Sequence, residues 1–183
     1  MNKKCLYTFN YDSNQSELVK MESRHIFDEE EKDKILFSDI MIEPTSSAFI
    51  KRRLDIILYN KDYESLINDI KKEDIRVEGF KVEYFVLDHD KTNYANRLSK
   101  LKDIGYSIEG IPDYYNPTIT YALCQFQDIW YFGVLTKNDF AWEKHKQKPH
   151  SFSNSISLNV AKALLNIATK VNKEKKLIDT CCG

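Results

Sequence analysis

Strand-like and helix-like segments alternate along roughly the first 140 residues of the chain. The clearest of them is a helix over residues 61–72. Its apolar side chains fall at i, i+3, i+4 and i+7 and form one stripe: Tyr63, Leu66, Ile67 and Ile70. A stripe of this width becomes stable when it packs on another element, so the alternation predicts a sheet covered by helices and an α+β fold.

The same patterns place the other elements. Alternation and β-branched or aromatic residues predict strands at 4–11, 35–42, the end of 49–59, 80–87, 118–126 and 129–135. Helical spacing predicts helices at 17–27, 94–105 and 157–171, with a helix at 48–54 as an alternative to the strand there. Gln127-Asp128 joins two strands as a hairpin turn, and the acidic run 28–31 predicts a solvated loop.

Composition suits a folded, water-exposed protein. Hydrophobic residues make up 42% of the 183 residues and charged residues 30%. No run approaches the ~18 apolar residues of a membrane span, and the N-terminus does not resemble a signal peptide, so we expect a cytoplasmic protein. The four cysteines lack Cys-x-x-Cys spacing, which favours reduced thiols over a zinc site or a disulfide framework.

The formal net charge is −1, which argues against a surface coated with non-specific nucleic-acid contacts. A local basic face is still possible, because binding depends on how charge is distributed. Four clusters could form such a face, and each could equally be an ordinary solvated surface: Lys51-Arg52-Arg53, Lys71-Lys72, Arg97-Lys100-Lys102, and Lys144 to Lys148 with Trp142 and His145.

Residues that could bind a metal ion or act as a nucleophile give weaker indications of a functional site. Asp88-His89-Asp90 contains metal-ligand types, but adjacent residues point in different directions, so a polar turn is favoured. Glu22 and His25 lie three apart on a predicted helix without a second such pair. We therefore predict no metal site. Cys181-Cys182 has no histidine placed to activate a nucleophile.

Two segments near the C-terminus resemble a known family. The first runs from Lys148 to Leu158 (KPHSFSNSISL) and continues into the Ala…Ala-Leu…Asn-x-Ala helix of residues 161–168. The second is 177–183, LIDTCCG. Together they look like the start of the methyltransferase domain in the THUMP-containing tRNA guanine-N2 methyltransferases. The family's cofactor motif usually reads Asp-Pro-x-Cys-Gly-x-Gly; here Thr180 replaces the proline and a second cysteine precedes the glycine.

The resemblance extends to the N-terminal part. Residues 1–27 resemble the family's ferredoxin-like piece, and residues 80–138 resemble a THUMP domain. The implied fold is α+β: a ferredoxin-like region at 1–60, a THUMP-like RNA-binding region at 61–138, a linker at 139–155 and, at 156–183, the helix and first strand of a truncated Rossmann-like methyltransferase domain. The chain would then be the front part of a longer enzyme, ending inside the cofactor motif.

The resemblance also implies site residues. The S-adenosylmethionine site of the longer enzyme would include Phe152, Ser153, Asn154, Asp179, Cys181 and Gly183, although we do not expect this chain to bind the cofactor. THUMP modules bind the acceptor end of tRNA, which favours two of the basic clusters as RNA-binding residues: Lys51, Arg52, Arg53, Trp142, Lys144, Lys146 and Lys148. The family's Asn/Asp-Pro-Pro-aromatic motif is missing, since Asn116-Pro117-Thr118 is its nearest match, so we predict no catalytic residue.

The leading hypothesis is therefore the RNA-recognition part, for tRNA, of an S-adenosylmethionine-dependent methyltransferase that modifies a guanine exocyclic amine. One alternative is a non-catalytic RNA-binding module. Another is a related methyltransferase that acts on ribosomal RNA or DNA, because the amine-methylating domain is shared among these enzymes.

Overall fold

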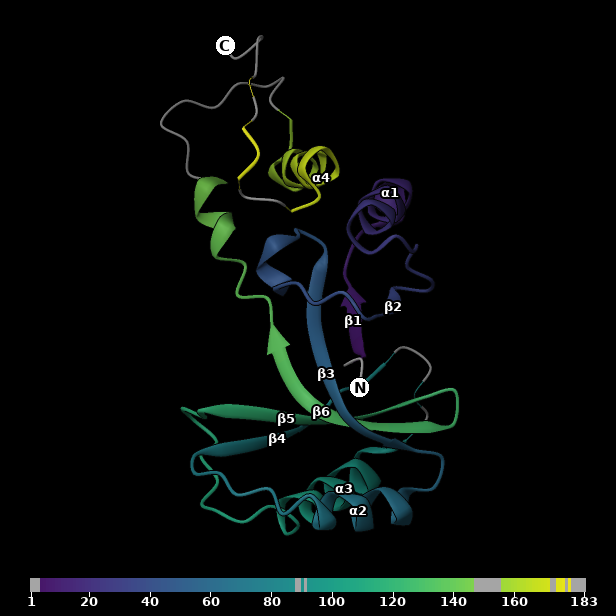
Figure 1. Ribbon diagram of the computed structural model, residues 1–183, viewed down its shortest axis with the longest axis vertical. Helices are drawn as coiled ribbons and strands as arrows, with labels where there is room; N and C mark the ends of the chain where they lie inside the picture. The colour runs from purple at the N-terminus through teal and green to yellow at the C-terminus, as the bar shows by residue number, and fades with distance from the viewer. Residues whose placement is uncertain are drawn as a thin grey trace. The chain divides into compact units, whose positions relative to one another are not determined.

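The computed structural model describes residues 4–87, 90, 92–146, 156–171, 174–176 and 178 (Figure 1). Its helices and strands follow in this order: β1 (Cys5–Phe9), η1 (Ser13–Gln15), α1 (Ser16–Phe27), β2 (Ile35–Ser38), η2 (Pro44–Ser46), β3 (Ile50–Asn60), α2 (Tyr63–Lys72), β4 (Phe80–Tyr84), α3 (Tyr94–Gly105), β5 (Ile119–Phe126), β6 (Ile129–Lys137), η3 (Ala141–Lys146) and α4 (Leu158–Thr169). The η segments are single short 3₁₀ helices.

The strands form one six-stranded sheet in the order β2-β1-β3-β6-β5-β4. Strands β4 and β5 are parallel, whereas β5 and β6 form an antiparallel hairpin. The sheet is therefore mixed, and the predicted α+β class is confirmed. Among the described residues, no helix combines the length and the apolar character that a membrane span requires.

The chain divides into two compact units that are not consecutive in sequence. Unit 1 comprises residues 1–6 and 53–136, and unit 2 comprises residues 7–52 and 137–183. Strands β1, β3 and β6 each contribute residues to both units. Strand β3 crosses from one unit to the other near its start, and the domain boundaries after residues 60 and 138 stay a prediction.

In unit 1, α2 and α3 cover one face of the β4-β5-β6 part of the sheet (Figure 1). The predicted stripe of α2 is confirmed, since Leu66, Ile67 and Ile70 are buried. The helix begins two residues later than expected because the Asp62 side chain accepts the Ser65 N–H (2.8 Å) and caps it. The core around these side chains is rich in aromatic rings and aliphatic groups: Phe80, Ile104, Ile108, Tyr121, Leu123, Trp130 and Phe132.

In unit 2, α1 and α4 pack together (Figure 1). Their neighbours include the Tyr7 ring, whose centroid lies 4.7 Å from that of Phe27. The Tyr7 hydroxyl donates to the Ile40 carbonyl (2.9 Å) and accepts the Ile42 N–H (2.9 Å). Residues 40–42 are thus held by a side chain, and β2 ends at Ser38, earlier than the predicted strand at 35–42.

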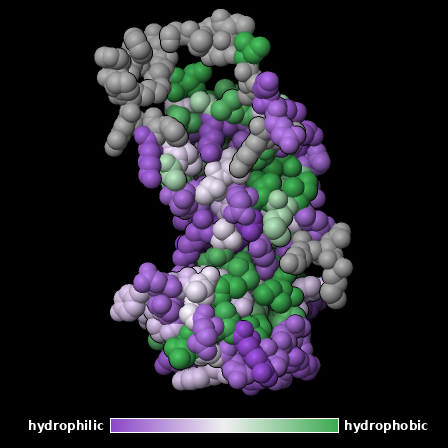
Figure 2. Space-filling model, turned by 60° about the vertical axis from the view of Figure 1, so that its left-hand side comes forward, coloured by the Kyte–Doolittle hydropathy of each residue, from purple (hydrophilic) through white to green (hydrophobic). Residues whose placement is uncertain are grey.

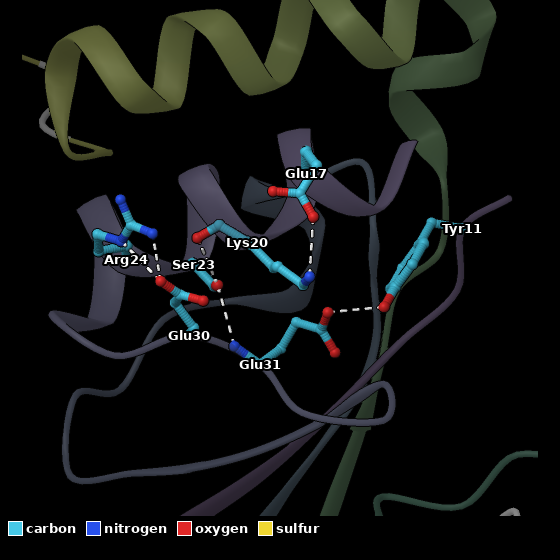
Figure 3. Close-up of polar contacts among 7 residues, drawn as sticks. All are labelled: Tyr11, Glu17, Lys20, Ser23, Arg24, Glu30 and Glu31. Carbon is cyan, nitrogen blue, oxygen red and sulfur yellow. Dashed lines mark hydrogen bonds and ion pairs between the residues drawn. The ribbon is translucent and has the colours of Figure 1, made fainter. Parts of the chain in front are cut away.

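The acidic run after α1 is only partly solvated, contrary to our prediction. Glu31 is 3% exposed, and Figure 3 shows the Tyr11 hydroxyl directed at its carboxylate (2.6 Å). The Glu31 N–H donates to the Ser23 hydroxyl (3.2 Å), which ties the run to α1. Burial and the neighbouring carboxylate raise the pKa of Tyr11 to about 12. A long-range partner, invisible in the local sequence, therefore buries one of the four acidic residues.

Candidate nucleic-acid interface

The basic run at the start of β3 separates into exposed and buried residues. Lys51 is exposed and Arg52 is half-buried. Arg53 is 5% exposed, and its Nε and Nη2 donate to the two carboxylate oxygens of Asp55 (2.7 and 3.1 Å). A buried, bidentate ion pair does not present its guanidinium to a phosphate. We therefore retain Lys51 and Arg52 as candidate RNA contacts and omit Arg53.

Strand β6 brings a further lysine beside this run. Strands β3 and β6 are neighbours in the sheet, and the Asn138 N–H donates to the Lys51 carbonyl (3.0 Å). Lys137, the last residue of β6, is exposed. The sequence did not single it out as an RNA contact, because no local pattern shows that β3 and β6 pair. We call Lys51, Arg52 and Lys137 the basic strand pair.

A buried asparagine holds the backbone around the basic strand pair. The Asn138 Nδ2 lies within hydrogen-bonding distance of the carbonyls of Pro44 (3.0 Å), Ser47 (3.1 Å) and Ile50 (2.8 Å). Its Oδ1 accepts the Phe140 N–H (2.9 Å). An amide group has two N–H donors, so three carbonyls share them. The Asn138 side chain thus holds the residues that precede Lys51 against the end of β6.

The segment predicted as a linker contains η3, which carries Trp142, Lys144 and Lys146. Lys144 is exposed, whereas Trp142 is half-buried. The Trp142 ring lies edge-on to Phe140, with centroids 6.3 Å apart, and the Lys162 Nζ is 5.7 Å from its centroid. The tryptophan thus already contacts α4, which limits the ring surface available for stacking on a base. Lys148 lies outside the described residues.

A second buried polar cluster joins α1, α4 and the segment before β3. Glu22 is 1% exposed; the Asn166 Nδ2 donates to its Oε1 (2.6 Å) and the Ser47 hydroxyl to its Oε2 (2.8 Å). Asn166 also donates to the Ser46 carbonyl (2.9 Å). Burial raises the pKa of Glu22, and the bonds from Asn166 and Ser47 and the charge of Lys162 oppose that rise. The cluster connects α4 to the residues that precede the basic strand pair.

The other two basic clusters, in unit 1, are largely engaged by their own unit. Lys72 pairs with Asp69 (3.0 Å), and the Arg97 guanidinium lies 5.3 Å from the Tyr84 ring centroid. The Lys100 Nζ lies 3.4 Å from the Tyr63 centroid, and burial lowers its pKa. Lys71 and Lys102 are exposed. Ring and carboxylate contacts therefore occupy part of these two clusters.

The predicted cofactor residues lie outside the described part of the chain: Phe152, Ser153, Asn154, Asp179, Cys181 and Gly183. Asp88 and His89 also lie outside it. Within the described residues, no cluster of three or more His, Cys, Asp or Glu side chains could hold a metal ion.

Comparison with known proteins finds no matching family model and no matching curated protein. The similar solved structures include three at 8–9% sequence identity. PH1313 from Pyrococcus horikoshii Ot3 has a TM-score of 0.49, and the match covers 75% of this chain and 56% of that chain. A 4-thiouridine synthetase–RNA complex with bound ATP (0.43, 75% and 42%) and TrmN from Thermus thermophilus (0.42, 72% and 45%) are the other two. The chain thus spans about half of the length of these chains.

Proposed function

We propose that this chain is the RNA-recognition part, with tRNA as the RNA, of a cytoplasmic S-adenosylmethionine-dependent methyltransferase that modifies a guanine exocyclic amine. The motifs at 148–168 and 177–183 support the methyltransferase assignment. In this proposal the chain combines a ferredoxin-like and a THUMP-like region with the first elements of a Rossmann-like domain.

The observation that carries the proposal is the bonding of Asn166. This residue is the asparagine of the Ala…Ala-Leu…Asn-x-Ala pattern, and it donates to Glu22 of α1 and to the Ser46 carbonyl. Lys51, Arg52 and Lys137 belong to the same unit. The helix that resembles the start of a methyltransferase domain is thus built into the unit that carries the basic residues.

The basic strand pair supplies the chemistry for RNA contact. Lysine and arginine neutralise phosphates and release condensed counterions, which makes binding depend strongly on salt. Lys144 adds an exposed cation on η3. S-adenosylmethionine would supply the methyl group, with Phe152, Ser153, Asn154, Asp179, Cys181 and Gly183 as its proposed neighbours. We assign no methyl-transfer step to a residue of this chain.

The double substitution Lys51→Ala/Arg52→Ala tests the RNA contact. We expect the affinity for tRNA to fall about tenfold and the slope of log affinity against log salt to decrease by about two, because each side chain contributes about one phosphate contact. Fluorescence anisotropy with labelled tRNA over a salt series measures both quantities.

The matched control is Lys32→Ala/Lys61→Ala, which removes the same charge at two exposed positions that do not belong to the basic strand pair. An equal loss in the control, or an unchanged salt slope in the test variant, would contradict the proposed contact. Ribosomal RNA fragments and duplex DNA in the same titration distinguish tRNA from the alternative substrates. Methylguanosine levels in tRNA from a strain lacking the gene test the methyl transfer, and unchanged levels would refute it.

A further inference from the structure

The connection between α3 and β5 in unit 1 exposes several large side chains. Tyr106 is 88% exposed, Ile111 72%, Tyr114 65% and Tyr115 92%. Single exposed apolar residues are common on proteins, whereas several within ten residues mark a contact surface. Tyrosine is also enriched in protein interfaces, because it offers a large ring and little rotamer entropy to lose. We call residues 106–118 the tyrosine loop.

The tyrosine loop is held in one conformation by main-chain bonds to residues 75–80. Three of these bonds are Glu109 N–H to Ile75 O (2.9 Å), Gly79 N–H to Ile111 O (2.9 Å) and Asp113 N–H to Phe80 O (2.8 Å). At Gly110 the two segments approach so closely that a Cβ atom would lie 2.0 Å from the Val77 carbonyl oxygen. The loop is thus preorganised, which reduces the entropy lost on binding a partner.

A carboxylate fixes the turn that carries the two adjacent tyrosines. The N–H groups of Tyr115 and Asn116 donate to Asp113 Oδ1 (2.9 and 3.0 Å). These bonds lower the pKa of Asp113, so its carboxylate stays ionised at neutral pH. Tyr114 and Tyr115 are therefore displayed from a rigid turn beside a negative charge.

The charge around the tyrosine loop has the opposite sign from that of the basic strand pair. The tyrosine loop and residues 75–80, to which it is bonded, carry three carboxylates against one cation: Glu78, Glu109 and Asp113 against Arg76. Arg76 is itself paired with Asp74 (2.8 Å) and Glu109 (3.1 Å). This field repels phosphate and attracts cationic side chains, so it disfavours RNA as the occupant.

We propose that the tyrosine loop is a docking surface for an arginine-rich segment of a partner protein. Guanidinium groups stack on exposed tyrosine rings and are attracted by the carboxylates around them. The surface lies in unit 1, and none of its residues belongs to the basic strand pair of unit 2. The two proposed surfaces therefore share no residue.

The test uses the complete 183-residue chain and a short, fluorescently labelled oligoarginine peptide as the probe. We expect Tyr114→Ser/Tyr115→Ser to weaken peptide binding about five- to tenfold, the loss of two exposed cation–π contacts. The substitution leaves the net charge unchanged, so attraction by the carboxylates alone predicts no change. Circular dichroism confirms that the fold is retained, because neither ring makes a described side-chain contact.

The matched control is Tyr94→Ser, which removes an equally exposed tyrosine (79%) at the start of α3, outside the tyrosine loop. The proposal requires this variant to bind oligoarginine like the parent chain. Equal affinity of the double variant and the parent would overturn it. A loss of single-stranded RNA binding in the double variant, with oligoarginine binding retained, would also overturn it and identify the loop as a base-stacking surface.

Discussion

We expect Asn138→Ala to lower the free energy of unfolding by about 2–4 kcal/mol. Asn138 is 7% exposed, and its amide group is the side-chain donor to the carbonyls of Pro44, Ser47 and Ile50. Buried carbonyls that lose their donor keep the cost of desolvation without the bond that offsets it. Urea unfolding followed by circular dichroism measures the change.

Asn14→Ala is the matched control, because Asn14 is an exposed asparagine of the same unit. It should change stability by less than about 0.5 kcal/mol. Asn138→Asp separates the two halves of the amide: it keeps the acceptor for the Phe140 N–H but replaces the donor with an anion beside three carbonyls. We expect it to destabilise at least as much as alanine. Wild-type-like stability of both Asn138 variants would refute the stabilising role of the Asn138 amide.

Local sequence patterns were enough to predict several elements. The stripe of α2 is set by helical spacing within ten residues, and burial of Leu66, Ile67 and Ile70 confirms it. The hairpin between β5 and β6 is also confirmed. Gln127 and Asp128 both adopt positive φ (48° and 62°), as a tight two-residue hairpin turn requires. Such features need no knowledge of distant partners.

Strand β3 shows where local patterns fail. The alternative helix at 48–54 is wrong, because residues 50–60 form one continuous strand between β1 and β6. The residues of a central strand are buried by neighbours far away in sequence, so apolar and polar residues do not alternate cleanly along it. The same limit applies to Arg53. Strand geometry places Arg53 and Asp55 on one face, but only the fold shows that Arg53 is buried there.

The candidate site depends on similar long-range pairing. Lys137 joins Lys51 and Arg52 only because β6 lies beside β3. Glu22 and Asn166 are 144 residues apart, and the helical pattern around each gave no sign that they meet. Sequence predicted basic residues and a helix with a family-like pattern. The bonds from that helix to Glu22 and to the Ser46 carbonyl arise from tertiary contacts between elements far apart in sequence.

The hydrogen bonds of Asn166 lead to the second large expected effect, the loss of stability on Asn166→Ala. At neutral pH we expect this substitution to lower the free energy of unfolding by about 1.5–3 kcal/mol, because it removes a donor to the buried carboxylate of Glu22. The matched control is Asn159→Ala on the same helix, where the side chain is half-buried without a described bond. Urea unfolding of both variants over a pH series gives the comparison.

The pH dependence identifies Glu22 as the cause of this effect. Burial raises the folded-state pKa of Glu22, so the unfolded state loses its proton first and stability falls as pH rises towards the folded pKa. Asn166 and Ser47 limit that fall by binding the charged form, with Lys162 as the nearby cation. The loss caused by Asn166→Ala should therefore grow as pH rises through the pKa of Glu22 and be smallest in acid. In a Glu22→Gln background the loss should become independent of pH. A pH-independent loss in the presence of Glu22 would show that Asn166 does not act through the charge of Glu22.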